Sequence, residues 1–192
     1  AQIYAVDNEP EFIKTLKTNI DKHHLNNKIT PIVGSIDDLP FHEDVFDLIW
    51  AEGAAYILGF EKGVQYWRKF LKKNGLIVVS EVSWLSEKQP IRLKKYWKKI
   101  YPEIDSIANK KKVLIRNGFF PMAQFVLPNS CWTLNYYTPL KKALFNFKEK
   151  YKNQPEAMQI VSTINEEIQM YEKYNKHYGF VFYIAKKTTK II

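Results

Sequence analysis

Residues 1–12, AQIYAVDNEPEF, decide the fold class because they predict a strand that passes through an acid into a helix. The opening residues favour strand formation, and the run stops at Asp7. Asn8 is expected to cap the helix, with Glu11 in the reciprocal capping-box position. Apolar residues then recur along one side of residues 9–22, as in an amphipathic helix. A strand followed by such a helix is the repeating unit of an α/β sheet.

Asp7 has a chemical meaning at this position. An acid at the carboxyl end of a buried strand faces the crevice where doubly wound folds hold nucleotides, and it can accept hydrogen bonds from both ribose hydroxyls. In such folds a glycine-rich turn precedes the acid by about 20 residues. The sequence holds seven glycines, and none of them forms a Gly-x-Gly cluster. We therefore expect this sequence to lack an earlier strand that the working protein has.

The alternation of strands and helices continues downstream. Strands are expected at residues 29–33, 45–51 and 76–81, and the helix before the last of them is expected to end at Asn74-Gly75. The second of these strands is almost wholly apolar, which is typical of a strand buried on both faces of a parallel sheet. We predict an α/β fold with a Rossmann-like, mostly parallel sheet.

The second half of the sequence predicts a helical excursion between two strands. Helices are expected at 90–101, at 105–117 and, as two helices broken near Pro155, over 139–178; strands are expected at 119–126 and 180–185. This order predicts that the last two strands pair antiparallel at the edge of the sheet. Without a linker or an internal repeat, the 192 residues are expected to form a single domain, residues 1–192.

Composition narrows the classes of function. The net charge is +9, but the lysines are spread over many helical faces, which argues against a focused nucleic-acid site. Cys131 is the single cysteine, which fits a reducing cytoplasm. No apolar run reaches the ~20 residues that cross a bilayer. The four histidines, His23, His24, His42 and His177, lack metal-ligand spacing, so no metal site is expected.

Four short motifs follow one another along residues 1–85. They are VDNEP at 6–10, GSIDDLPF at 34–41, FDLIWAEGA at 46–54 and LKKNGLIVVSE at 71–81. In this order and spacing the sequence resembles the class I S-adenosylmethionine-dependent methyltransferases, in the branch with a Leu-Pro-Phe motif. The rest of the chain resembles that family only in the order of its strands and helices. The resemblance implies a transferase with S-adenosylmethionine as its cofactor and a small molecule as its methyl acceptor.

The resemblance also implies where the adenosine part of the cofactor would bind. Asp7 would hold the ribose hydroxyls, and Asn8 would lie beside the adenine. The turn Ser35-Ile36-Asp37 would surround the adenine edge. Many relatives carry an acid at position 35, so here Asp37 or a backbone carbonyl would accept from the exocyclic amine.

The methionine end of the cofactor would be lined by Glu52 and Gly53, which follow the central strand in the resemblance. The glycine-rich turn of the family has no counterpart in this sequence. The expectation of an incomplete sequence therefore stands beside one alternative, a diverged relative that no longer binds the cofactor.

The acceptor pocket is predicted from aromatic residues and one acid. Methyl transfer is an in-line displacement in which orientation supplies much of the acceleration, so no catalytic residue is predicted. The candidates are Tyr56, Glu81, Trp84, Trp132, Tyr136 and Tyr137. The last three lie in SCWTLNYYTP, residues 130–139, expected as a lid between a strand and the helical excursion. The alternative is an aromatic core that joins the excursion to the sheet.

The leading hypothesis is a cytoplasmic small-molecule methyltransferase, and a homo-oligomer is compatible with the sequence. The second is a non-catalytic module of the same fold, RNA-associated through its lysines. The third is a nicotinamide-dependent oxidoreductase, which Asp7 alone would suit equally. The pairing of residues 34–41 with residues 46–54 argues against that third hypothesis.

Overall fold

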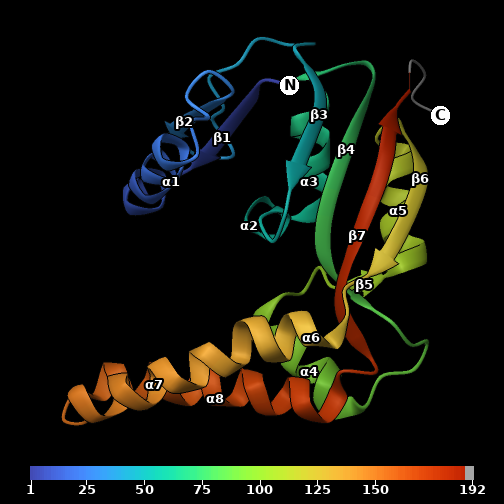
Figure 1. Cartoon of the computed structure of the whole chain (residues 1–192). Helices are drawn as coiled ribbons and strands as arrows, with labels where there is room; N and C mark the ends of the chain where they lie inside the picture. The colour runs from blue at the N-terminus through green and yellow to red at the C-terminus, as the bar shows by residue number, and fades with distance from the viewer. Residues whose placement is uncertain (189–192) are drawn as a thin grey trace. The chain divides into compact units, whose positions relative to one another are not determined.

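The protein is described by a computed structural model over residues 1–188, and it divides into two compact units, one up to Val45 and one from Phe46 onward (Figure 1). Each unit is described by itself. The expectation of a single domain over 1–192 therefore stays a prediction.

The first unit is a β-α-β element. It consists of β1 (Ile3–Asp7), α1 (Pro10–Lys22) and β2 (Ile29–Val33). The two strands pair in parallel and in step, with Asp7 opposite Val33 at their carboxyl ends. Ile13 and Ile20, seven residues apart on one side of α1, are its buried side chains. The strand, helix and strand predicted for this segment are confirmed within one residue.

The predicted cap of α1 is wrong. The residue at the cap position is Glu9, whose side chain makes no capping hydrogen bond, and Asn8 lies one residue outside the helix. Asp7 makes the side-chain hydrogen bond at the start of the helix instead, because its Oδ1 accepts from the Glu9 backbone N–H at 2.8 Å. An aspartate that bonds the backbone two residues ahead makes the Asx turn that competes with a capping box.

The second unit is built on a five-stranded sheet. Its strands are β3 (Phe46–Ala51), β4 (Leu71–Trp84), β5 (Asp105–Ser106), β6 (Phe119–Val126) and β7 (Tyr178–Lys187). Along the sheet the order is β3-β4-β7-β6, and β5 pairs with β4. The strands β3 and β5 run parallel to β4, whereas β7 is antiparallel to both β4 and β6. The α/β class and the antiparallel final strand are confirmed.

The helix expected before β4 ends earlier than predicted. It is α3 (Phe60–Arg68), and Leu71 already belongs to β4, where it pairs with Phe46. The next pair along the two strands is Leu48 with Leu76, so residues 72–75 bulge out of β4. Asn74 does take the left-handed backbone expected of it, with φ 66°, but in a bulge rather than at a helix end.

The remaining helices are α2 (Ala55–Leu58), α4 (Ile91–Ile100), α5 (Ile107–Arg116), α6 (Asn129–Trp132), the π-helix η1 (Thr133–Tyr137), α7 (Thr138–Lys150) and α8 (Pro155–Tyr174). The helices α7 and α8 lie side by side as the predicted excursion (Figure 1). The segment at 130–139 is helical throughout, and its role as a lid stays a prediction. Burial explains the helical structure, because Trp132 and Tyr137 are both less than 10 % exposed and hold the segment against the end of β7.

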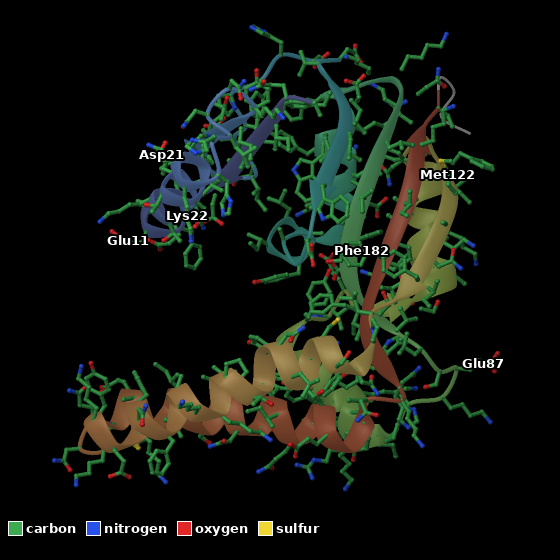
Figure 2. All side chains as sticks on the ribbon, in the orientation of Figure 1. Glu11, Asp21, Lys22, Glu87, Met122 and Phe182 are labelled. Atoms are coloured by element: carbon green, nitrogen blue, oxygen red, sulfur yellow. The ribbon has the colours of Figure 1, made fainter. Side chains whose placement is uncertain are left out.

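The two faces of the sheet in the second unit have different neighbours. Because cross-strand partners share a face, Glu81 and Ser83 of β4 lie on the same face as Tyr183 of β7. That face meets α3, since the rings of Phe60 and Tyr183 are 5.6 Å apart. On the other face Phe182, labelled in Figure 2, contacts Trp50 and stacks on Phe125 at 5.0 Å.

Candidate cofactor and acceptor site

The first unit places two of the predicted cofactor elements at one end of its strands. The backbone N–H of Gly34 donates to the carbonyl of Asp7 at 3.0 Å, which ties the end of β2 to the end of β1. Directly after Gly34, the Ser35 hydroxyl donates to the carboxylate of Asp37. The Asp38 N–H closes the turn by donating to the Ser35 carbonyl at 3.2 Å. Asp7 and the turn at 35–37 are therefore neighbours, as parallel strands require.

The carboxylate of Asp7 is only partly used by the protein. Its Oδ1 holds the Glu9 N–H, and Oδ2 makes no hydrogen bond among residues 1–188. A carboxylate that is fixed at one oxygen and open at the other can accept bonds from a vicinal diol. Ser35 adds a second fixed acid, because its hydroxyl orients the Asp37 carboxylate.

The second unit holds the loop predicted for the methionine end of the cofactor. The Gly53 N–H donates to Ser80 Oγ of β4 at 2.8 Å, and Ser80 is only 2 % exposed. Gly53 has φ +60°, and no atom lies within 4 Å of the place where a side chain would begin. Glu52 accepts a hydrogen bond from Trp50 Nε1 at 3.2 Å. The loop is thus anchored from beneath and open above Gly53, which leaves room for a ligand beside its backbone.

Two of the predicted acceptor residues come together in the second unit. Tyr56 lies on α2, three residues after Gly53, and is 53 % exposed; Tyr136 lies in η1 and is 47 % exposed. Burial, then the charge of Glu167 and then Tyr56 raise the pKa of Tyr136. The structure therefore brings the Tyr136 hydroxyl near both Glu167 and the Tyr56 hydroxyl.

Trp132 and Tyr137 belong to a buried aromatic cluster. Trp132 stacks between Tyr171 of α8 and Phe180 of β7, with ring centroids 4.5 and 5.0 Å apart. The hydroxyl of Tyr137 donates to Glu167 Oε1 at 3.0 Å. These contacts support the alternative of an aromatic core for Trp132, whereas the hydroxyl of Tyr137 is used to bind Glu167.

Trp84 lies apart from Tyr56 and Tyr136. It packs at the margin of the aromatic cluster and lines an open depression of about 440 Å³ together with Lys94, Asp105 and Asn109. Its place in the acceptor pocket stays a prediction without support from a contact to Tyr56 or Tyr136.

Glu81 is enclosed in a separate buried network. Its side chain is 1 % exposed, and Oε1 lies 4.0 Å from Lys110 Nζ, which is itself 3 % exposed. Burial raises the pKa of Glu81 to about 7, and the positive charge of Lys110 opposes that rise. Lys110 Nζ also lies 4.6 Å from the centre of the Phe60 ring and donates to the Glu103 carbonyl at 2.9 Å. This enclosure favours a structural role for Glu81, and its place in the acceptor pocket stays a prediction.

Sequence reasoning missed Ser80, Lys110 and Glu167. Lys110 opens the run Lys110–Lys112, in which one buried lysine cannot be told from two solvated ones. Ser80 sits in an apolar strand run, where a small polar residue gives no signal. Glu167 lies three residues after Ile164 and four before Tyr171, so helical spacing places it, unlike Glu166, on the apolar side of α8; that spacing was the signal available in the sequence.

Two further searches cover residues 1–188 only. No group of three or more His, Cys, Asp or Glu residues within that range is arranged to hold a metal ion. None of the helices in the described part of the chain combines the length and apolarity needed to cross a membrane.

Residues 1–79 match a family model described as "Methyltransferase domain". That range takes in β1, β2, β3 and the first part of β4, and with them the predicted cofactor residues of each unit. No curated protein matches the sequence.

Solved structures with a similar fold cover nearly the whole chain. A SAM-dependent methyltransferase from Geobacter sulfurreducens, solved with S-adenosyl-L-homocysteine, aligns with a TM-score of 0.78 and 13% identity over 96% of this chain and 74% of its own. YjhP from E. coli aligns with a TM-score of 0.78 and 13% identity over 97% of this chain and 76% of its own.

The same fold also occurs in a protein described by a different reaction. The [4+2]-cyclase SpnF aligns with a TM-score of 0.74 and 16% identity over 98% of this chain and 67% of its own. At these identities the structural likeness shows the fold, so the family model and the motifs inside it carry the assignment. The match over residues 1–79, less than half of the chain, shows that this part is similar to a methyltransferase domain, and the chain as a whole has the fold of solved S-adenosylmethionine-dependent methyltransferases.

Proposed function

We propose that this protein transfers a methyl group from S-adenosylmethionine to a small molecule in the cytoplasm. The observation that carries the proposal is the pairing of Asp7 with the turn at Ser35–Asp37, at the adjoining ends of two parallel strands. This is the end of an α/β sheet at which nucleotide ligands bind.

The residues present fit the adenosine part of the cofactor. Asp7 Oδ2 has room for a ribose hydroxyl because Oδ1 alone serves the backbone. Asp37, oriented by Ser35, supplies an acid at the turn where the resemblance leads one to expect an acid at position 35. A carboxylate there accepts a hydrogen bond from an exocyclic amine, so the Ser35–Asp37 pair is the proposed adenine contact.

The methionine end is proposed to meet the loop at Glu52 and Gly53. The left-handed backbone at Gly53 and the open space above it suit close approach of a ligand. When bound, the cofactor supplies a sulfonium methyl group, and the protein's own contribution is to hold that group and the acceptor in line.

The replacement Asp7→Asn is expected to weaken binding of S-adenosylhomocysteine by about 1–3 kcal/mol, because a charged acceptor is removed from two hydroxyls. The asparagine keeps an oxygen for the Glu9 N–H, so α1 should still begin at the same place. The measurement is a calorimetric titration of S-adenosylhomocysteine into the full-length protein.

Asp21→Asn is the matched control for that titration. Asp21 lies on α1, is exposed and is labelled in Figure 2. It should bind S-adenosylhomocysteine as the unmodified protein does. Equal affinity in Asp7→Asn and Asp21→Asn, with both folded, would remove Asp7 from the ribose site. Tighter binding of NADH than of S-adenosylhomocysteine would favour the oxidoreductase hypothesis instead.

The replacement Ser80→Ala is expected to weaken S-adenosylhomocysteine about fivefold, because the Gly53 N–H loses its acceptor and the loop loses its anchor; a lost hydrogen bond of this kind is worth about 1 kcal/mol. Ser83→Ala is the control, since Ser83 bonds the Tyr183 hydroxyl at 2.7 Å on the opposite face of the sheet. Both replacements should lower stability slightly, and only the first should change the dissociation constant. If both change it equally, the effect belongs to β4 as a whole.

RNA association, the second hypothesis, has a separate signature. Phosphate contacts through lysines produce affinity that falls steeply with salt. Salt-dependent RNA binding in a protein that does not bind S-adenosylhomocysteine would favour the non-catalytic module.

A further inference from the structure

Glu167 is a half-buried acid without a cation. Its Oε1 accepts the Tyr137 hydroxyl at 3.0 Å, and it forms no ion pair with any residue in the described range 1–188. Elsewhere on the same helix, Glu172 pairs with Lys141 at 2.6 Å. In a chain with 29 lysines and arginines against 20 acids, a half-buried carboxylate left without a counter-charge is unusual.

Tyrosines surround this carboxylate. Tyr137 and Tyr136 are consecutive in η1, and their rings are 5.1 Å apart. A π-helical turn is a local irregularity that often occurs at functional sites. Burial and, after it, the charge of this acid raise the pKa values of Tyr136 and Tyr96. The carboxylate is therefore held by the Tyr137 hydroxyl, and the half-exposed ring of Tyr136 lies against the ring that holds it.

We propose that Glu167, held by the Tyr137 hydroxyl, and the half-exposed ring of Tyr136 together bind an ammonium group of the methyl acceptor. An ammonium ion is the group that gains from both a carboxylate and aromatic faces. An anionic acceptor would be repelled by Glu167, and a neutral apolar one would desolvate the carboxylate without compensation. The inference deepens the proposed function, and it rests on that function for the statement that the ligand is the acceptor.

The position of Tyr56 links this site to the methyl group. It lies three residues after Gly53, the proposed contact of the methionine end, and it is near enough to Tyr136 to affect the pKa of that hydroxyl. An amine held as its ammonium ion has no lone pair with which to attack. Transfer of one proton from the nitrogen to the Glu167 carboxylate frees that lone pair, and burial of Glu167, which raises its pKa, makes the carboxylate a better proton acceptor.

The test measures binding rather than turnover, so that its outcome does not depend on knowing the acceptor. The probe is choline, a quaternary ammonium that has no lone pair to methylate, titrated calorimetrically into the full-length protein. Its neutral counterpart of the same shape, 3,3-dimethylbutan-1-ol, is titrated in parallel. Choline is expected to bind at least tenfold more tightly than the neutral alcohol.

Two variants and one control assign the binding to the residues named. Glu167→Gln keeps an oxygen for the Tyr137 hydroxyl and removes the charge, and it should weaken choline at least tenfold without changing the affinity of the neutral alcohol. Tyr136→Leu should weaken choline by about fivefold through loss of one ring face. Glu166→Gln is the matched control; Glu166 lines a different depression with Arg92 and Lys95 and should change neither affinity.

Equal binding of choline and the alcohol, no binding of choline, or unchanged choline affinity in Glu167→Gln would each overturn the inference. The proposed function is read separately, by S-adenosylhomocysteine. Failure of that ligand to bind, with choline binding intact, would leave an ammonium site in a protein that is not a methyltransferase. Binding of S-adenosylhomocysteine without choline would keep the methyltransferase and reject the ammonium site.

Discussion

Lys110→Met is expected to lower the free energy of unfolding by about 3–5 kcal/mol at pH 9 and by only about 1 kcal/mol at pH 5. Methionine fills much of the lysine stem's volume but leaves Glu81, 1 % exposed, without its counter-charge 4.0 Å away. Breaking one side of a buried pair is costly because the remaining charge stays buried. Urea unfolding at the two pH values measures the difference.

The direction of the pH effect follows from the pKa of Glu81. Burial raises that pKa to about 7, from an ordinary value of 4.5. At pH 5 the carboxyl is therefore protonated in the native protein, and removing Lys110 leaves no buried charge. At pH 9 it is ionised and depends on Lys110. The stability that Glu81 gains from its raised pKa is fully present below pH 4.5 and is lost as the pH rises through 7.

Two variants check this account. Lys112 lies two residues further along α5 and is exposed, so Lys112→Met should change the free energy of unfolding by less than about 0.5 kcal/mol at either pH. Adding Glu81→Gln to Lys110→Met should recover most of the loss at pH 9, because the unpaired charge is gone. An equal loss at pH 5 and pH 9 would show that packing around Lys110, and not charge, is what the native state requires.

The buried pair Glu81–Lys110 is also connected to the turn that follows the helix of Tyr56. Lys110 donates to the Glu103 carbonyl, and the Glu103 carboxylate accepts the Phe60 N–H at 3.2 Å at the start of α3. Gly59, between α2 and α3, has φ +86°, and a side chain there would come within 2.7 Å of the Glu103 carboxylate. The helix that carries Tyr56 is thus followed at once by a turn that this network fixes.

The fold could be predicted from the sequence where burial and periodicity agree. Strands β1, β2 and β3 are apolar runs bounded by polar turns, and each is found within one residue of its predicted place. Prediction failed where one apolar pattern serves two structures. Phe70 and Leu71 continue the stripe of α3, yet they leave the helix because Leu71 pairs with Phe46, 25 positions earlier in the chain.

The candidate site could be predicted only in part. Asp7 and the turn at Ser35–Asp37 follow from strand ends, because parallel strands bring those ends together whatever the packing. Glu81 and Trp132 could not be placed, since an acid or an aromatic residue near a strand end has the same sequence signal in a pocket and in a core. The proposed role of Glu167 could not be predicted, because it depends on the lack of an ion pair among the described residues, which only the three-dimensional contacts reveal.

Trp132→Ala is expected to lower the free energy of unfolding by about 3–5 kcal/mol, as removal of a buried aromatic side chain does. The ring is 8 % exposed and is stacked between Tyr171 and Phe180, so truncation leaves a cavity between α8 and β7. Trp132→Phe should lose less, because one ring remains in the stack. Denaturant unfolding of both variants measures the order.

Trp50→Ala is the matched control, because the same residue type is 60 % exposed on β3 and should cost less than about 1 kcal/mol. The prediction separates two roles for Trp132. If its loss leaves stability unchanged and raises the acceptor KM, the ring contacts the acceptor directly. If Trp132→Ala lowers stability while Trp132→Phe keeps both stability and choline binding near normal, Trp132 acts by packing. Its contact with Tyr137 then holds in place the turn whose Tyr137 hydroxyl binds Glu167.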